Sequence, residues 1–331
     1  MFEAYQAYQR ELELQPVEFM ALERTFGERL DVARTALARY VGADAGNLTF
    51  APNASTALNT VIRSLGLGPG DEILLGDAEY GGMEILWEFV AARTGVRLVR
   101  RPFAELEPGP KTRVVFCSHI EWISGRVNDL RPAVEAARAA GALSVVDGAH
   151  APGQIPLALD ELGADVYAGN CHKWLCNLRP SAFLYARPEV QDMIEPLVIS
   201  WDYVDGASFP ERHRWQGTLS PCAYLTVPHA IDFQAEHDWP SVRIRSHRML
   251  EALRERLPLE PLTDNFVQMR GFRLPEGTDG PALKTWLYDE HRIEVPIVED
   301  RHGWTMRVSV QGYNTDGDLD ALVGALARWH G

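Results

Sequence analysis

Short apolar runs alternate with helical patterns from residue 48 to residue 185, and this alternation is the strongest constraint on the fold. Helical patterns occupy residues 55–65, 83–94 and 132–140. Strand-length runs are predicted at residues 48–51, 72–75, 96–100, 113–118, 143–147, 166–168 and 182–185. Strands that alternate with helices form a mostly parallel sheet that helices cover on both faces. The sequence therefore predicts an α/β fold with a mostly parallel seven-stranded sheet.

The pattern changes near residues 220–229, which indicates a second domain. A long helical stretch runs from residue 223 to residue 256, with a break near Trp239. After it come strand patterns at 266–270, 294–297 and 305–310 and helices at 280–291 and 316–329. We expect residues 1–40 to form N-terminal helices, split near Pro16, that pack with the small domain. Residues 41–228 would form the large domain, and residues 229–331 the smaller C-terminal α/β domain.

Composition limits the classes of function. The chain has 46 acidic and 32 basic residues and a net charge of −14, so it repels a phosphate backbone and nucleic-acid binding is not expected. Its four cysteines are too few and too irregularly spaced for a secreted disulfide framework. The first residues are polar and helix-like, and no apolar run is long enough to span a membrane. These features predict a cytoplasmic protein.

Several common motifs are absent or out of place. Gly66–Gly70 follows a helix and precedes a strand, which is the wrong order for a dinucleotide-binding loop and disfavours a nicotinamide oxidoreductase. The sequence has no G-x-x-x-x-G-K-[ST], G-x-S-x-G or H-E-x-x-H motif. Nucleotide hydrolysis, serine-esterase chemistry and a metal site are therefore not predicted.

Lys173 stands out because the chain has only three lysines, the others being Lys111 and Lys284. It follows a predicted buried strand, between His172 and Trp174. A lysine in a partly apolar site has a lowered amine pKa, which suits Schiff-base chemistry. Most lysines instead lie on solvated surfaces, so this position alone leaves both interpretations open.

Two further segments supply what pyridoxal 5'-phosphate (PLP) requires. Asp147 ends a predicted parallel strand, where a carboxylate faces the ligand crevice and can pair with the pyridine nitrogen. Residues 53–56 open a helix, where free backbone N–H groups can bind a phosphate. Taken singly, these segments have ordinary explanations as a turn and a helix cap. Together, with Lys173 about 26 residues after Asp147, they predict a PLP site.

The sequence resembles the class V aminotransferase family of PLP enzymes, which has the PLP-dependent transferase fold type I. The resemblance covers nearly the whole chain, from Phe50–Asn59 to Met306–Asn314. Within the family, the sequence is most similar to the isopenicillin N epimerase-like branch, in segments Glu79–Gly81, Ser118–Ile120, Asp147–His150 and Gly169–Leu175. The resemblance implies a homodimer with shared active sites and a small amino-acid substrate.

The resemblance also implies how the residues around the cofactor ring act. Lys173 would carry PLP as a Schiff base and move the proton at the substrate Cα. Asp147 would pair with the pyridine nitrogen, and His150 would lie near the 3-hydroxyl. Tyr80 matches the position whose side chain stacks on the ring.

Further matches concern the phosphate and the substrate. Ala54 and Ser55 would donate to the phosphate, with His172 and Asn170 completing its site. Gly217 and Thr218 match a segment that reaches the phosphate of the neighbouring subunit. Arg307, between two apolar residues on a strand, matches the arginine that binds the substrate α-carboxylate, which a guanidinium binds bidentately.

The reaction is less constrained than the cofactor. A persulfide-forming desulfurase is not expected, because no cysteine follows Cys222, which begins a helix. His119 and Cys171 are expected to pack in the core or to support the site from behind, without contacting the ligand. We expect an epimerase-like enzyme, with C–S β-elimination from a cysteine conjugate or its sulfoxide as the first alternative and transamination as the second. A non-catalytic protein with the same fold is a remote alternative.

Overall fold

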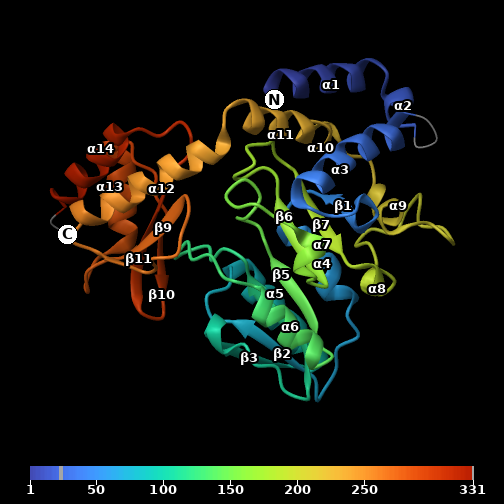
Figure 1. Ribbon diagram of the computed structural model, residues 1–331, viewed down its shortest axis with the longest axis horizontal. Coiled ribbons are helices and arrows are strands. Elements are labelled where there is room, and N and C mark those ends of the chain that lie inside the picture. The colour runs from blue at the N-terminus through green and yellow to red at the C-terminus, as the bar shows by residue number, and fades with distance from the viewer. Residues whose placement is uncertain (22–24, 330–331) are drawn as a thin grey trace. The chain divides into compact units, whose positions relative to one another are not determined.

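The computed structural model describes residues 1–21 and 25–329, which form two compact units (Figure 1). The first unit comprises Met1–His119 and Asn128–His237, and the second comprises Ile120–Val127 and Asp238–Gly331. The predicted boundary at residues 228 and 229 therefore lies nine residues too early. Among the described helices, none is long and apolar enough to cross a membrane.

The first unit is built on a seven-stranded sheet with the order β1-β7-β6-β5-β4-β2-β3. Its strands are β1 (Leu48–Ala51), β2 (Glu72–Gly76), β3 (Arg97–Arg101), β4 (Thr112–Ser118), β5 (Leu143–Asp147), β6 (Val166–Asn170) and β7 (Ala182–Ala186). β7 runs in the opposite direction to the other six strands, because no crossover helix separates it from β6. The predicted mostly parallel, seven-stranded sheet is confirmed.

Eleven α-helices are described in this unit: α1 (Phe2–Leu14), α2 (Pro16–Phe19), α3 (Gly27–Val41), α4 (Ala54–Ser64), α5 (Gly81–Thr94), α6 (Arg131–Ala139), α7 (Leu159–Leu162), α8 (Pro188–Gln191), α9 (Phe209–Arg214), α10 (Cys222–Leu225) and α11 (Val227–Glu236). Short 3₁₀ turns lie at Ala45–Asn47 and Phe103–Glu105. α3 packs on α11, α10 and β1, and α1 packs on α10. The N-terminal helices thus bury apolar faces within the first unit, to which they belong.

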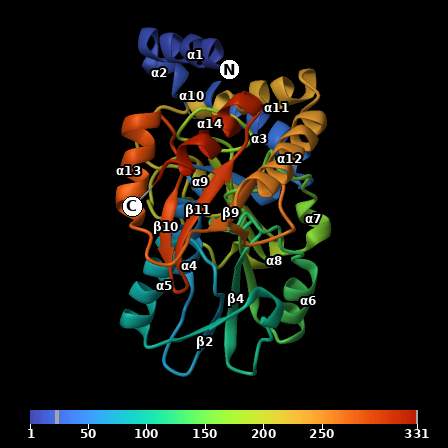
Figure 2. The ribbon, with the colours of Figure 1, turned by 90° about the vertical axis from the view of Figure 1, so that its left-hand side faces the viewer.

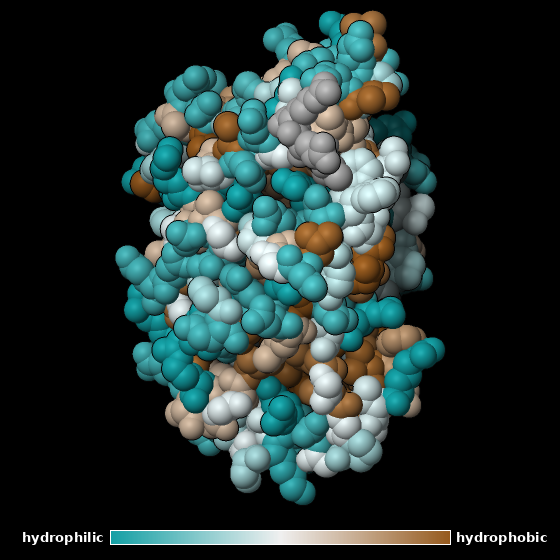
Figure 3. All heavy atoms as spheres, turned by 90° about the vertical axis from the view of Figure 1, so that its right-hand side faces the viewer, coloured by the Kyte–Doolittle hydropathy of each residue, from teal (hydrophilic) through white to brown (hydrophobic). Residues whose placement is uncertain are grey.

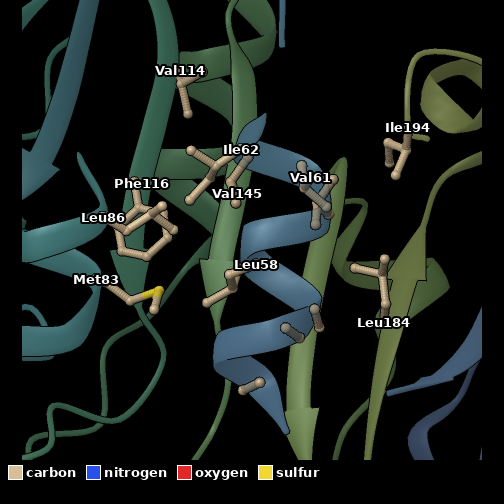
Figure 4. Packing of buried hydrophobic residues seen from close by; sticks show 14 of the residues in the cluster. Leu58, Val61, Ile62, Met83, Leu86, Val114, Phe116, Val145, Leu184 and Ile194 are labelled. Carbon is tan, nitrogen blue, oxygen red and sulfur yellow. The ribbon is translucent and has the colours of Figure 1, made fainter. Parts of the chain in front are cut away.

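The core of the first unit holds α4 against the sheet (Figure 4). Leu58, Val61 and Ile62 recur at helical spacing and are almost fully buried among residues such as Phe116 of β4 and Val145 of β5. Burying side chains of this size stabilises the fold by roughly 1.5–3 kcal/mol each. β1 runs in the same direction as β6, because both are antiparallel to β7. α4, which follows β1, therefore starts at the edge where the parallel strands end.

The second unit contains a four-stranded antiparallel sheet with the order β10-β11-β9-β8 (Figure 2). Its elements are α12 (Trp239–Arg256), β8 (Glu260–Pro261), β9 (Met269–Arg273), α13 (Gly280–His291), β10 (Ile297–Asp300), β11 (Gly303–Ser309) and α14 (Asp316–Leu326). The three helices and the sheet share one apolar core. β9 and β10 each begin three residues later than predicted. For β10 the reason is Pro296, which has no N–H to donate to a neighbouring strand.

Residues Ile120–Val127 join the second unit, although the sequence placed them in the large domain. The amide of Gly271 in β9 donates to the Ser124 carbonyl at 2.8 Å, and the amide of Val127 donates to the Asn265 carbonyl at 3.0 Å. Gly125 has φ +78°, and a Cβ there would lie 2.1 Å from the carbonyl oxygen of Met269. Only glycine permits so close an approach of the two backbones.

Candidate active site

Neighbouring strands of the first unit end in polar residues at one edge of the sheet. In the parallel register, Ser118 of β4 pairs with Asp147 of β5. The next strand, β6, ends at Asn170, and the turn after it carries Lys173. α4 starts beside them, since the amide of Ala54 donates to Oδ1 of Asn170 at 2.9 Å. Open α/β sheets bind ligands at this edge, so these residues form the candidate site.

Asp147 is a buried carboxylate with an unused oxygen. The residue is only 5% exposed, and its Oδ1 accepts a hydrogen bond from the Ala149 amide at 2.9 Å. Among the described residues, Oδ2 has no hydrogen-bond partner and the carboxylate has no ion pair. Burial raises the pKa of this carboxyl, while the Ala149 amide and the charge of Lys173 oppose the rise. A protonated ring nitrogen against Oδ2 would supply the missing partner.

Lys173 lies in the turn after β6 and has an exposed side chain. Its Nζ lies 3.0 Å from Nε2 of His150, which belongs to the turn after β5. On the other side of this imidazole, the indole N–H of Trp174 donates to Nδ1 at 3.2 Å. The structure thus brings together Lys173 and His150, as the sequence indicated, and adds Trp174, which the sequence did not identify.

The first turn of α4 offers hydrogen-bond donors to an anion. Asn53 caps the helix by accepting from the Thr56 amide at 2.8 Å, and the Ala54 amide is taken by Asn170. Between them, the amide and the hydroxyl of Ser55 have no hydrogen-bond partner in the described part of the chain. Free donors at the positive end of a helix dipole fit a phosphate group.

His172 is fixed against the strand that follows it. Its Nδ1 lies 2.6 Å from the carbonyl oxygen of Ser181 and 3.1 Å from the Ser181 amide nitrogen. Burial lowers the pKa of His172, the Ser181 contact opposes this, and the charges of Lys173 and Arg179 lower it further. With Nδ1 held in this way, Nε2 is the ring nitrogen left for a ligand.

Tyr80, Gly217 and Thr218 come from other segments of the first unit. Tyr80 is the N-cap residue of α5, which follows β2, and its side chain is 43% exposed. Its ring lies over Gly82, where a Cβ would be 2.7 Å from Tyr80 Cε1. Gly217, with φ +93°, and the exposed Thr218 lie in the bend between α9 and α10. A Cβ on Gly217 would meet nothing within 4 Å.

His119 supports Asp147 from the neighbouring strand end, one of the two roles that the sequence left open. Its amide donates to the Asp147 carbonyl at 2.9 Å, and its Nδ1 lies 2.8 Å from the Tyr167 hydroxyl. Burial lowers the pKa of His119 to about 4, so the ring is neutral at physiological pH. The preceding Ser118 donates from its amide and its hydroxyl to the buried Glu79, at 3.1 and 2.6 Å. The signal that could have identified His119 is the one that identified Asp147, a polar residue directly after a buried strand.

Arg307 belongs to the second unit, on the internal strand β11. One guanidinium nitrogen donates to the Trp122 carbonyl, while Nε is buried without a hydrogen-bond partner. No Asp or Glu of the described residues pairs with it. Burial lowers the pKa of Arg307 to about 10, so the group stays charged at neutral pH. A largely buried guanidinium without a counterion fits a ligand carboxylate.

The four cysteines are free thiols. Burial raises the pKa of Cys117, Cys171 and Cys222, and it raises the pKa of Cys176 to about 11. None therefore has the lowered pKa of a nucleophilic thiolate. Within the ranges that the structure describes, no three His, Cys, Asp or Glu side chains are grouped so that they could hold a metal ion.

These features define an α/β protein with an amine, an unpaired buried carboxylate and free helix donors at one sheet edge. The sequence pattern of the family described as aminotransferase class-V matches residues 2–270. Isopenicillin N epimerase of Streptomyces clavuligerus is 34% identical over 360 residues, covering 98% of this chain and 90% of that protein. Isopenicillin N epimerase of Amycolatopsis lactamdurans is 38% identical over 348 residues, covering 94% and 87%. The chain belongs to the class-V aminotransferase family, as its resemblance predicted.

More distant relatives extend the comparison. A putative L-cysteine desulfhydrase of Oryza sativa subsp. japonica is 27% identical over 342 residues, covering 90% of this chain and 70% of that protein. The cystine C–S lyase C-DES, solved with its product cysteine persulfide, has a TM-score of 0.85 and 23% identity, covering 99% and 93%. This likeness confirms the predicted fold. Family membership confirms the predicted enzyme class and cofactor, PLP.

Proposed function

We propose that this enzyme acts at the Cα of an α-amino acid and that its reaction is epimerase-like. The observation that carries the proposal is the contact of Lys173 Nζ with His150 Nε2 at 3.0 Å, beside the unpaired carboxylate of Asp147. The relatives that are 34% and 38% identical over most of the chain, both isopenicillin N epimerases, support the choice of reaction.

Three residues would surround the ring of bound PLP. Asp147 would accept the ring-nitrogen proton at Oδ2, and His150 would face the 3-hydroxyl. Tyr80 would stack on the ring, a contact that stabilises by about 1 kcal/mol beyond burial. When bound, PLP takes up the electron pair left at Cα when one of its bonds breaks.

The phosphate would lie at the first turn of α4. Ser55 has a free amide and a free hydroxyl to donate, and His172 has Nε2 available. Asn170 accepts from the Ala54 amide, so it holds the start of the helix and the end of β6 together. The helix dipole adds a favourable field for a negative charge.

Lys173 would move the proton at Cα. The unprotonated amine would take the proton from one face of Cα, and inversion requires the return of a proton to the opposite face from a second donor, such as water. Loss of a β-substituent before that return gives elimination instead.

Arg307 would bind the α-carboxylate of the substrate. Its guanidinium is largely buried and has no acidic partner among the described residues. Two parallel hydrogen bonds to a carboxylate would satisfy it better than the single carbonyl it contacts.

A homodimer is part of the proposal. Residues 193–204 expose Met193, Leu197, Val198, Ile199, Trp201, Tyr203 and Val204. Hydrophobic patches interrupt the hydrophilic surface on the side of the molecule where α8 and α9 lie (Figure 3). Apolar surface of this extent favours association. Gly217 and Thr218, in an open bend, would reach the phosphate of the second copy.

The cysteines bear on both location and reaction. Four free thiols favour a reducing compartment such as the cytoplasm. Their raised pKa values argue against a desulfurase, which needs a nucleophilic thiolate. C–S β-elimination remains the second candidate, because a relative that is 27% identical is named as an L-cysteine desulfhydrase.

The test is to incubate the full-length protein and PLP with isopenicillin N, common L-amino acids and cysteine conjugates in deuterated water. An epimerase produces the other configuration at Cα with one deuterium incorporated, measured by chiral chromatography and mass spectrometry. Pyruvate and ammonia from a cysteine conjugate would indicate elimination instead. Absence of Cα exchange and of every product, across the panel, would overturn the proposal. Lys173→Ala should abolish all exchange, and Lys284→Ala, on helix α13, is the matched control.

A further inference from the structure

Trp174 determines the hydrogen-bonding state of the imidazole that contacts Lys173. An indole N–H can only donate a hydrogen bond. Nδ1 of His150 accepts this bond at 3.2 Å and therefore carries a lone pair and no proton. Because a neutral imidazole has one N–H, its proton must lie on Nε2.

Nε2 is the atom that faces Lys173, with Nζ at 3.0 Å. With a proton on Nε2, this contact is a hydrogen bond only when the amine has a lone pair to accept it. An ammonium group has three donors and no acceptor. It would therefore point an N–H at the N–H on Nε2, and no hydrogen bond would form. We propose that Trp174 is a positioning residue that holds His150 in the Nε2–H tautomer and so favours the unprotonated, nucleophilic amine of Lys173.

Trp174 is held firmly enough to perform this role. The residue is 8% exposed, and its carbonyl oxygen accepts from Nε2 of Gln234 in α11 at 2.9 Å. Gly153, in the turn that carries His150, has φ +94°, and a Cβ there would lie 2.2 Å from the backbone of Trp174. The two turns are therefore packed backbone to backbone, which fixes the indole relative to the imidazole.

Other charges near Lys173 also affect the equilibrium between its ammonium and amine forms. An ionised Asp147 attracts the ammonium form, while burial raises the pKa of that carboxyl. His172 also interacts with Lys173, but burial lowers the pKa of this imidazole and keeps it neutral. The Trp174–His150 pair therefore acts against Asp147. The same Nε2–H would donate equally well to an anionic ligand oxygen, so the arrangement is compatible with PLP.

Histidine-selective ¹⁵N NMR of the full-length protein, after dialysis against hydroxylamine to remove any bound aldehyde, tests the tautomer. The His150 signals are those lost in His150→Gln. We expect a neutral ring with its proton on Nε2 in the wild type and a mixture of tautomers in Trp174→Phe, which keeps an aromatic ring but removes the donor. A wild-type ring protonated on Nδ1 would overturn the inference, even if every variant failed to fold.

Trace acetylation followed by peptide mapping tests the amine, since only an unprotonated amine reacts. The other two lysines, Lys111 and Lys284, serve as internal standards in the same sample. Trp174→Phe should slow acetylation of Lys173 at neutral pH by roughly three- to tenfold, the effect of one lost hydrogen bond, and leave the standards unchanged. Tyr313→Phe, which removes a hydroxyl donor from an aromatic ring that is 81% exposed, should change none of the three rates. An unchanged rate for Lys173 in Trp174→Phe would contradict the inference.

The role of Trp174 in catalysis rests on the proposed function, but the tautomer of His150 and the state of the Lys173 amine do not. The two proposals can therefore fail separately. Both measurements use the protein without PLP or substrate. Failure of Cα exchange with a confirmed Nε2–H tautomer would remove the proposed function alone. A confirmed exchange with an unchanged Lys173 reactivity in Trp174→Phe would remove the role of Trp174 alone.

Discussion

Replacing Arg307 with methionine should stabilise the protein and weaken substrate binding at the same time. Burial lowers the pKa of Arg307 from 12.5 to about 10, which corresponds to a penalty of at most about 3 kcal/mol on the charged form. The hydrogen bond to the Trp122 carbonyl offsets about 1–2 kcal/mol of this. Methionine has a similar length and no charge, so we expect a net gain of about 1–2 kcal/mol in the free energy of unfolding. The gain should persist at every pH below the folded-state pKa.

The same substitution removes the group proposed to bind the α-carboxylate. Breaking a buried charge pair costs about 3–5 kcal/mol, so KM should rise roughly a hundredfold or more. Because the carboxylate is bound equally in the ground state and the transition state, kcat should change little. Arg307→Lys should also raise KM, since an ammonium cannot form two parallel hydrogen bonds.

Urea unfolding and steady-state kinetics measure the two effects. Arg273→Met is the matched control, because Arg273 lies on the adjacent strand β9 but has a counterion, Asp300, at 2.8 and 3.0 Å. This control should lose stability and leave KM unchanged. An Arg307→Met variant that is less stable than the wild type and has an unchanged KM would refute the reasoning.

Three further predictions concern the cofactor and assembly. Borohydride reduction with PLP should label Lys173, and a label on Lys111 or Lys284 in a peptide map would exclude the assignment. Asp147→Asn should lower kcat with little change in KM, because Oδ2 can no longer hold the ring-nitrogen proton. It should also raise the free energy of unfolding at neutral pH, since burial raises the pKa of this carboxyl and disfavours its charged form. Urea titrations should show this gain in the free energy of unfolding decreasing as the pH falls below the folded-state pKa. There the wild-type carboxyl becomes protonated and is neutral, like the asparagine amide. Trp201→Asp should convert dimers to monomers in sedimentation velocity, and an unchanged distribution would contradict the proposed interface.

Elements defined by local patterns could be predicted from the sequence. Strands β1 and β5 and helix α13 have the predicted bounds, because an apolar run or helical pattern in each ends at clear turn or capping residues. Asp279, for example, caps α13 by accepting from the Ala282 amide at 2.9 Å. Such signals lie within a few residues of the element they limit, so they can be read without knowledge of the tertiary structure.

Groupings that depend on distant backbone contacts could not be predicted. Ile120–Val127 joins the second unit through hydrogen bonds to residues near 265 and 271, which no local pattern reveals. The N-terminal helices have apolar faces that any neighbour could cover, and the sequence does not reveal that α3 packs on α11. Hydrophobic periodicity identifies a buried face but not the surface that buries it.

The candidate site shows the same division. Asp147 and Lys173 could be named because each follows a buried strand, and parallel strands bring such positions together. Trp174 could not, because a buried tryptophan in sequence looks like a packing residue. Its importance depends on which imidazole nitrogen its N–H meets, and that requires the geometry of two turns. For the same reason, the sequence does not distinguish whether His119 packs in the core or supports Asp147, whose carbonyl accepts from the His119 amide.

Two largely buried charged groups form no ion pair with the described residues, the carboxylate of Asp147 in the first unit and the guanidinium of Arg307 in the second. Burial raises the pKa of Asp147 and lowers the pKa of Arg307, so in both cases it disfavours the charged form and destabilises the folded chain. If either position were only structural, asparagine or methionine would fill the same space without this penalty. Groups that lower stability are retained where function uses them. Under the proposed function, a protonated ring nitrogen would be the partner of Asp147 and a substrate carboxylate would be the partner of Arg307, so each penalty would be offset when its ligand binds.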